Sequence, residues 1–153
     1  MIRSEQEYRR ALERLEQDRS VLARQREQLE GLGLEGEELA RALQPMESFH
    51  QQFVEEVETY ERMKRGDLGA LRDLTGIGRW LIGLRIAKGL TQQQLAERLG
   101  VAPSQVSRDE NNEYHGISVD RAQRILEALG ARFEAHLTEP IIEEVDRKSL
   151  VKT

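Results

Sequence analysis

Residues 90–108, LTQQQLAERLGVAPSQVSR, predict two short helices joined by a tight turn. Thr91 suits the N-cap of the first helix, because its hydroxyl can accept a hydrogen bond from a free backbone N–H. Gly100 ends that helix where a left-handed backbone is needed, a conformation that glycine adopts without penalty. Pro103 stands at the first position of the second helix, where its missing N–H costs nothing.

The outward side of the second helix is polar. Ser104, Gln105, Ser107 and Arg108 all carry groups that hydrogen-bond to bases or phosphates. Two short helices at this spacing lay one helix across DNA and place the next in the major groove. The stretch therefore predicts a motif that binds double-stranded DNA through the major groove.

The segment from about residue 81 to residue 129 resembles the helix-turn-helix domain of the Xre and Cro/C1 regulator family, which includes many antitoxins. The residues that carry the resemblance are Leu84-Arg85, Gly89-Leu90-Thr91-Gln92, 95–101, Val106-Ser107-Arg108, Glu110 and 125–130. The resemblance implies a five-helix, lambda-repressor-like domain that acts as a dimer on a two-fold operator.

The resemblance also implies a site. Gln92 matches a glutamine that binds a phosphate and braces the recognition helix, and Arg85 and Glu110 match a partly buried ion pair between helices. Pro103 departs from the family pattern by replacing a side chain that often reads a base. Asp109 stands where an apolar residue is usual, which indicates a local rearrangement or a buried pairing. The expected DNA-contacting residues are Gln92, Gln93, Pro103, Ser104, Gln105, Ser107, Arg108, Asn111 and Asn112.

Composition narrows the class of protein. A chain of 153 residues, 38% of them hydrophobic, suits one or two small domains. It contains no run of about 18 apolar residues, so we expect no membrane span. The first residues, MIRSE, lack an apolar signal segment, and the absence of cysteine excludes disulfides and thiolate metal sites. We therefore expect a cytoplasmic protein.

The net charge of −5 is unevenly distributed along the chain. Residues 76–137 carry eight basic and seven acidic side chains, whereas residues 1–75 carry twelve basic and seventeen acidic ones. A nearly neutral binding domain neutralises few phosphates, which predicts a shallow salt dependence for each subunit. We expect that such a domain needs dimerisation to reach useful affinity.

Residues 1–65 predict an antiparallel, coiled-coil-like helical hairpin. Ser4 and Glu7 fit a capping box at its start, and glycines at 31–36 allow the chain to reverse. Apolar residues at heptad spacing on both sides of the glycines support two packed helices. The number of heptads does not decide whether the helices pair within one chain or between chains. Pro45 either kinks the second helix or starts a new one. The seam positions are Tyr8, Leu12, Leu15, Leu22 and Leu29, with Arg19 and Arg26 at polar alternates, and then Leu39, Leu43, Met46, His50, Phe53, Val57, Tyr60 and Lys64.

Residues 66–78 predict a glycine-containing linker, with Leu68, Leu71 and Leu74 docking on a DNA-binding domain at 79–130. Beyond that domain, alternating apolar residues predict a short β-strand over 131–138. A lone strand in an all-α domain needs a partner, so we expect it to pair with its own copy across a dimer axis. The expected dimerisation residues are Phe133, Ala135 and Leu137. Residues 139–153 predict a flexible tail.

Catalytic and metal sites are not expected. His50, His115 and His136 lie in three separate segments without zinc-ligand spacing, and no nucleophile motif is present. The glycines at 31, 33 and 36 match a dinucleotide fingerprint, but a charged helix rather than a strand precedes them, so we interpret them as a turn and expect no cofactor.

The sequence therefore predicts a dimeric, sequence-specific transcriptional regulator of the repressor type that is not an enzyme. A second interpretation is an antitoxin whose N-terminal helices bind a toxin while the helix-turn-helix domain represses the operon. A third is a protein-interaction adaptor in which the fold no longer contacts DNA, as the nearly neutral domain with Pro103 and Asp109 would allow.

Overall fold

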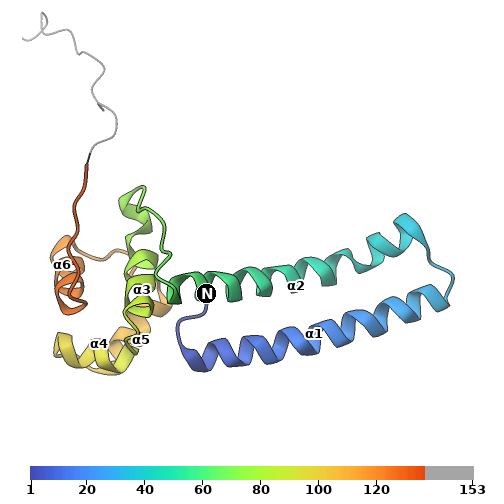
Figure 1. Cartoon of the computed structure of the whole chain (residues 1–153), viewed down its shortest axis with the longest axis horizontal. Coiled ribbons are helices and arrows are strands. Elements are labelled where there is room, and N and C mark those ends of the chain that lie inside the picture. The colour runs from blue at the N-terminus through green and yellow to red at the C-terminus, as the bar shows by residue number, and fades with distance from the viewer. Residues whose placement is uncertain (137–153) are drawn as a thin grey trace, which may run out of the picture.

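The computed structural model describes residues 1–136, and within them the chain forms six α-helices and one 3-10 helix but no β-strand. Two long helices, α1 (Glu5–Gly31) and α2 (Gly36–Lys64), form an antiparallel arm that projects from a small helical domain (Figure 1). No helix among the described residues is both long and apolar enough to span a membrane. The all-α class and the hairpin are as the sequence predicted.

Local sequence signals set the ends of the hairpin helices. The Ser4 hydroxyl accepts a hydrogen bond from the Glu7 N–H at 3.2 Å, as the capping pattern predicted, but the Glu7 carboxylate accepts from the Arg3 N–H, so only half of the capping box forms. Gly33, with φ +88°, takes the left-handed conformation needed to reverse the chain between the helices. Pro45 lies inside α2, which continues through it, so Pro45 does not start a new helix. Proline has no N–H to donate to the backbone carbonyl of Arg41, one turn earlier. Both residues are exposed, so water can reach that carbonyl.

The seam between α1 and α2 follows the predicted heptads only in part. Leu15, Leu43 and Val57 are buried between the helices as expected. Leu12 is 41% exposed, so the prediction that it lies in the seam is wrong. In α1 the second set of seam residues lies three residues after the first set, not four as predicted. Both spacings fit a heptad, because residues three and four apart lie on the same face of a helix. The partly buried alternates are Ala11, Asp18 and Gln25.

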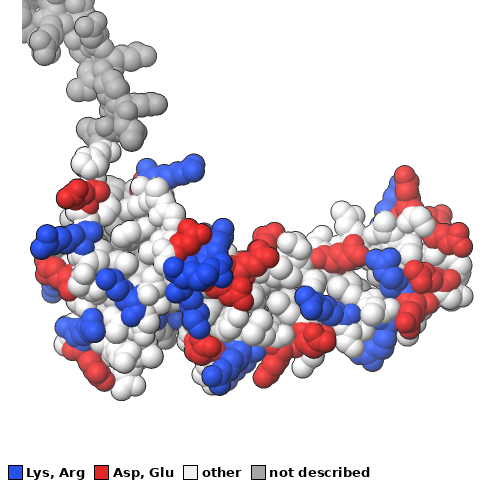
Figure 2. Space-filling view, in the orientation of Figure 1, with Lys and Arg blue, Asp and Glu red and all other residues white. Residues whose placement is uncertain are grey.

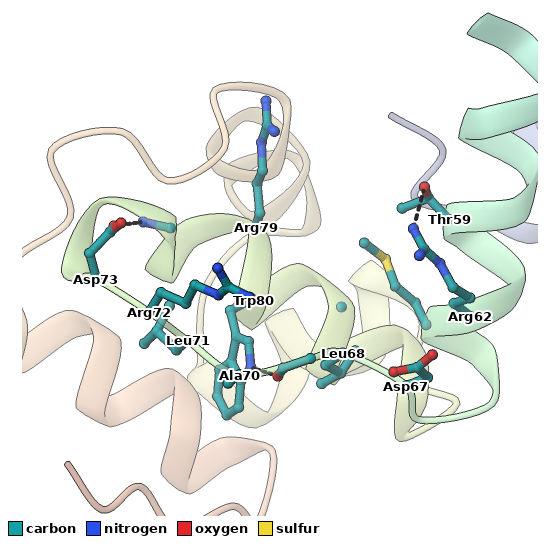
Figure 3. A pocket seen from close by; sticks show the side chains of 14 residues that line it. Thr59, Arg62, Asp67, Leu68, Ala70, Leu71, Arg72, Asp73, Arg79 and Trp80 are labelled. Carbon is teal, nitrogen blue, oxygen red and sulfur yellow. Dashed lines mark hydrogen bonds between the residues drawn. The ribbon is translucent and has the colours of Figure 1, made fainter. Parts of the chain in front are cut away.

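The linker region is packed against the helical domain. Leu68 lies over Gly83, where an added Cβ would come within 2.9 Å of the leucine side chain. The Trp80 indole N–H donates to the Gly69 carbonyl at 3.4 Å, beside a 380 Å³ cavity between the linker and the domain (Figure 3). Leu74 is 72% exposed, so its expected docking role is wrong. Leu68 is the leucine that seats the linker.

The domain contains α3 (Ile77–Ala87), α4 (Gln92–Leu99), α5 (Pro103–Asn111) and α6 (Val119–Ala128), with the 3-10 turn η1 (Leu74–Gly76) before them. Residues 79–130 contain these four helices and not the five that the resemblance implied. The hairpin supplies part of the cover for the core: Ile2, Val57 and Tyr60 belong to the same buried cluster as Leu81. Residues 1–65 and 79–130 are therefore packed together.

The predicted β-strand is also absent from the described residues. Residues 131–136 form neither a helix nor a strand, and no strand elsewhere in residues 1–136 pairs with them. The Phe133 ring instead lies edge-on to Trp80, with ring centroids 6.4 Å apart. The prediction of a strand is therefore wrong for residues 131–136, while a role of Phe133 and Ala135 in dimerisation stays a prediction. Leu137 and the predicted tail at 139–153 lie outside the described residues.

Candidate nucleic-acid interface

Local signals set the start of α4, its end and the start of α5. The Thr91 hydroxyl accepts from the Gln94 N–H at 3.1 Å, and the Gln94 side-chain oxygen accepts from the Thr91 N–H at 2.9 Å. Gly100 ends α4 with φ +67°, and Pro103 begins α5. Ala96 is fully buried, and its small side chain lets the two helices cross closely. The predicted roles of Thr91, Gly100 and Pro103 at the helix ends are therefore confirmed.

Helix α5 is amphipathic across its short length. Val106 and Glu110 face the interior with 2% and 0% of their surfaces exposed. Ser104, Arg108 and Asn111 lie on the opposite, exposed side at helical spacing. The Arg108 Nε donates to the Ser104 carbonyl at 3.2 Å, so the guanidinium lies along the outer surface of its own helix.

The other predicted contact residues are exposed or half-buried, apart from Gln105, which lines a cavity. Pro103 and Asn112 are exposed at the two ends of α5, and Ser107 is half-buried on its outer side. Gln93 is exposed on α4 and donates to Glu97 at 3.1 Å. Gln105 instead lines a small cavity shared with α6, so it leans away from the outer face. The structure gathers most of the expected residues along α5 and the start of α4.

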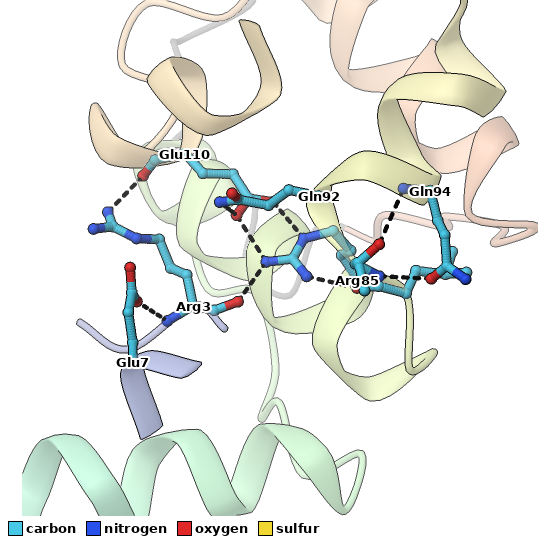
Figure 4. Close-up of polar contacts among 8 residues, drawn as sticks. Arg3, Glu7, Arg85, Gln92, Gln94 and Glu110 are labelled. Atoms are coloured by element: carbon cyan, nitrogen blue, oxygen red, sulfur yellow. Dashed lines mark hydrogen bonds and ion pairs between the residues drawn. The ribbon is translucent and has the colours of Figure 1, made fainter. Parts of the chain in front are cut away.

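A buried ion pair joins α3 to α5 (Figure 4). The Arg85 guanidinium donates to both carboxylate oxygens of Glu110, at 2.5 Å and 2.7 Å. Their side chains are 3% and 0% exposed, so the pair is more deeply buried than expected. Two parallel hydrogen bonds of this kind fix the relative orientation of the helices as well as the charges. The recognition helix is thereby anchored to the domain core.

Gln92 completes this anchor. Its side-chain amide donates to Glu110 at 2.8 Å, so α4 and α5 are tied at the same carboxylate (Figure 4). Arg85 also donates to the Leu90 carbonyl at 2.6 Å, which closes the turn before α4. The bracing role expected for Gln92 is thus visible in the geometry, while its phosphate contact stays a prediction.

Asp109, the departure from the family pattern, forms an ion pair with Arg121 of α6. Its side chain is 24% exposed and that of Arg121 is 41% exposed, so the pair lies at the edge of the interior. Of the two possibilities that the sequence left open, the structure shows the pairing. The pair ties α5 to α6.

The loop after α5 is held against α3. Glu113 and Tyr114 adopt left-handed backbone angles, φ +50° and +53°, which are unusual for residues other than glycine. The Arg79 side chain donates to Glu113 at 2.7 Å, and this hydrogen bond holds the pKa of the Glu113 carboxyl below its usual range. Tyr114 is buried, and burial raises the pKa of its hydroxyl. Tyr114 therefore anchors the loop.

Sequence reasoning missed the contribution of the N-terminal segment. Arg3 contacts both Arg85 and Glu110, and the base of α2 lies beside the start of α4. Lys64 pairs there with Glu5 at 2.9 Å, which holds the pKa of the Glu5 carboxyl below its usual range. No local pattern signals contacts between residues 82 and 107 positions apart.

The geometry agrees with the comparison to known families. Residues 81–135, about a third of the chain, match a family of domains described as helix-turn-helix. This segment is therefore a helix-turn-helix domain, the class with which regulators bind DNA, as the sequence resemblance implied. Neither the curated proteins nor the solved structures contain a match to the chain. Within residues 1–136, no group of three histidine or acidic side chains is arranged to hold a metal ion.

Proposed function

We propose that this protein is a sequence-specific DNA-binding transcriptional regulator of the repressor type, and that it binds DNA as a dimer. The observation that carries the proposal is the exposed polar face of α5 on a helix whose inner face is anchored by Arg85, Gln92 and Arg121. A recognition helix held this way enters the major groove without ordering cost, which favours binding.

The outer face of α5 offers donors suited to DNA. Arg108 carries the guanidinium on this face, and arginine is the side chain that most often reads guanine. Ser104 and Ser107 supply hydroxyls to bases, and Asn111 lies where the helix end meets the sugar-phosphate backbone. The proposal assigns base reading to the first part of α5 and positioning on the backbone to Gln92 and Asn111.

Charge supports dimeric binding. Arg85 is buried in its ion pair and is not available to neutralise phosphates, while Arg79 and Arg121 already contact carboxylates at the domain surface. Figure 2 shows acidic and basic side chains interspersed along the hairpin. One subunit thus brings few free cations to DNA, and two subunits on a two-fold operator would double the contacts.

Selection of duplexes from a random-sequence pool, followed by titration of the enriched duplex, tests the proposal. We expect enrichment of a two-fold symmetric site with two chains bound. Arg108→Ala should weaken binding about tenfold or more, the cost of a lost base contact. Arg41→Ala, which removes an exposed arginine from the hairpin, is the matched control.

Failure to enrich any sequence, or equal affinities for the Arg108 and Arg41 variants, would contradict the proposal. The adaptor interpretation would then take its place. Binding with one chain per site would reject the dimer while leaving DNA recognition intact. Sedimentation of the free protein separates these outcomes, because it reports the oligomeric state without DNA.

An antitoxin role is a second candidate, and the shape of the hairpin favours it. The arm projects away from the DNA-binding domain (Figure 1), with Leu32 77% exposed at its far end and Phe49 51% exposed near the middle of α2. The antitoxin proposal takes these two side chains as contacts for the toxin. Co-expression with the protein encoded beside it should relieve growth arrest, and Phe49→Ser should abolish that relief while leaving DNA binding intact.

A further inference from the structure

The N-terminal segment lies against the recognition helix although it is more than a hundred residues away in sequence. Ile2 is 5% exposed and belongs to the core shared with the helix-turn-helix domain. The backbone carbonyl of Arg3 accepts from Arg85 at 2.8 Å, and the Arg3 side chain donates to the Glu110 carbonyl at 3.0 Å (Figure 4). Arg3 thus contacts both partners of the buried ion pair.

The guanidinium of Arg3 lies at the C-terminal end of α5. The last carbonyls of a helix carry partial negative charge and lack partners within the helix, so a cation placed there stabilises it. The same Glu110 carbonyl also accepts from the Glu113 N–H at 3.0 Å, where the chain leaves the helix. Arg3 therefore acts at the point where the helix passes into the loop.

The surroundings of Arg3 indicate a fixed side chain rather than a free surface charge. Its Nε is buried and, among the described residues, has no hydrogen-bond partner. Giving up hydration at this atom has a cost that the contact with α5 offsets. The Arg3 backbone N–H donates to the Glu7 carboxylate at 2.7 Å, which ties this residue to α1.

We infer that Arg3 is a positioning residue for the recognition helix, so that the hairpin is part of the DNA-reading unit and not a separate appendage. This inference rests on the proposed function. Arg3 links α1 through Glu7, α3 through Arg85 and α5 through Glu110. A shift of the hairpin base consequently displaces the C-terminal end of α5.

The test compares Arg3→Ala and Arg3→Lys with Arg10→Ala, which removes an exposed arginine of α1 for which no ion pair occurs within residues 1–136. Alanine at position 3 keeps the backbone carbonyl that Arg85 uses, so it isolates the side-chain contact with α5. Lysine retains a donor and a charge that can reach the helix end. Thermal unfolding of each variant verifies that it is folded.

Two readouts are measured on each full-length variant. Amide hydrogen exchange of the free protein reports the last turn of α5, where the Asn112 N–H donates to Arg108 and the Glu113 N–H to Glu110. Affinity for the selected duplex is measured at several salt concentrations. We expect Arg3→Ala to speed exchange in this turn and to weaken binding about tenfold, the loss of one charge-assisted hydrogen bond, with partial rescue by lysine.

The salt dependence separates positioning from direct phosphate contact. A positioning residue leaves the slope of log affinity against log salt unchanged, whereas loss of a phosphate contact lowers it by about one per chain. A lowered slope, or a variant indistinguishable from Arg10→Ala in both readouts, overturns the inference. If the wild-type protein enriches no duplex, the proposed function fails, and hydrogen exchange still decides whether Arg3 orders α5.

Discussion

Gly78 shows how closely the backbone of α3 approaches the loop after α5. A Cβ at this position would lie 1.8 Å from the carbonyl oxygen of Glu113 and 2.8 Å from its carbonyl carbon. Both are backbone atoms, so no side-chain rotation relieves the overlap. The glycine is required by this contact, since the residue is helical and its φ is not positive.

We expect Gly78→Ala to lower the free energy of unfolding by about 2–3 kcal/mol, because the loop must move away from α3. Urea unfolding followed by circular dichroism measures the change. Gly31→Ala is the matched control, since nothing lies within 4 Å of a Cβ there. Similar stabilities for the two variants would show that the loop yields freely.

The Arg85–Glu110 pair offers a second prediction at the residue scale. Glu110→Ala leaves the buried guanidinium without its carboxylate and should cost about 3–5 kcal/mol. Replacement of both residues, by Arg85→Met with Glu110→Leu, should cost less than Glu110→Ala alone, because no charge is then buried. Urea unfolding of the wild type, of Arg85→Met, of Glu110→Leu and of the double variant measures the coupling, with Glu110→Ala measured beside them. Additive costs would contradict the prediction.

The base of the hairpin is an element whose stability depends on pH. Tyr8 and Tyr60 stack with ring centroids 5.0 Å apart, and the Tyr60 hydroxyl lies 3.4 Å from a Glu5 carboxylate oxygen. Burial, together with the negative charge of Glu5, raises the pKa of Tyr60 from 10.0 to about 12. The structure therefore favours the neutral phenol.

Because the pKa is higher in the folded state, the stabilisation is complete below pH 10 and is lost as the pH rises toward 12. We expect the melting temperature to fall across this interval, and Tyr60→Phe to flatten the fall. Thermal unfolding at a series of pH values measures it, with tyrosinate absorbance as the probe of ionisation. An unchanged pH profile in the Tyr60→Phe variant would reject the assignment to Tyr60.

The hairpin also shows what an element's sequence leaves open. The heptads of α1 predicted both a seam and its antiparallel partner, yet Leu12 faces outward while Asp18 lies partly inside. A heptad allows the second seam residue to lie either three or four residues after the first. Hydrophobicity alone favoured the spacing of four, which contains Leu12, and that choice is wrong. Packing against α2 determines which register is used.

At the scale of the whole molecule, the buried residues form more than one core. The main cluster joins the base of the hairpin to the helix-turn-helix domain through Ile2, Val57 and Tyr60. Leu39 and Leu43 are buried near the far end of the hairpin but lie outside that cluster. The far end should therefore open without unfolding the domain.

Leu43→Ala tests this division. We expect it to destabilise the far end of the hairpin by about 2–4 kcal/mol, since Leu43 is 1% exposed, and to raise hydrogen exchange there but not in α3–α6. Val57→Ala, in the main cluster, should raise exchange in both regions. Equal effects of Leu43→Ala on the hairpin and on α5 would show that the chain opens as a single unit.

The sequence by itself determined the helix boundaries near Thr91, Gly100 and Pro103 and the polar outer face of α5. These features depend on hydrogen bonds and side-chain periodicity within a few residues. It also indicated the Arg85–Glu110 pair, through a family resemblance rather than through local chemistry.

Only the tertiary structure decided that Asp109 pairs with Arg121, that Arg3 reaches the end of α5, and that the base of the hairpin covers part of the domain core. The predicted strand after Gly130 failed for a related reason, because a strand depends on a partner that no local pattern supplies. Contacts between distant segments are selected by the shape and charge of surfaces that exist only after the helices have packed.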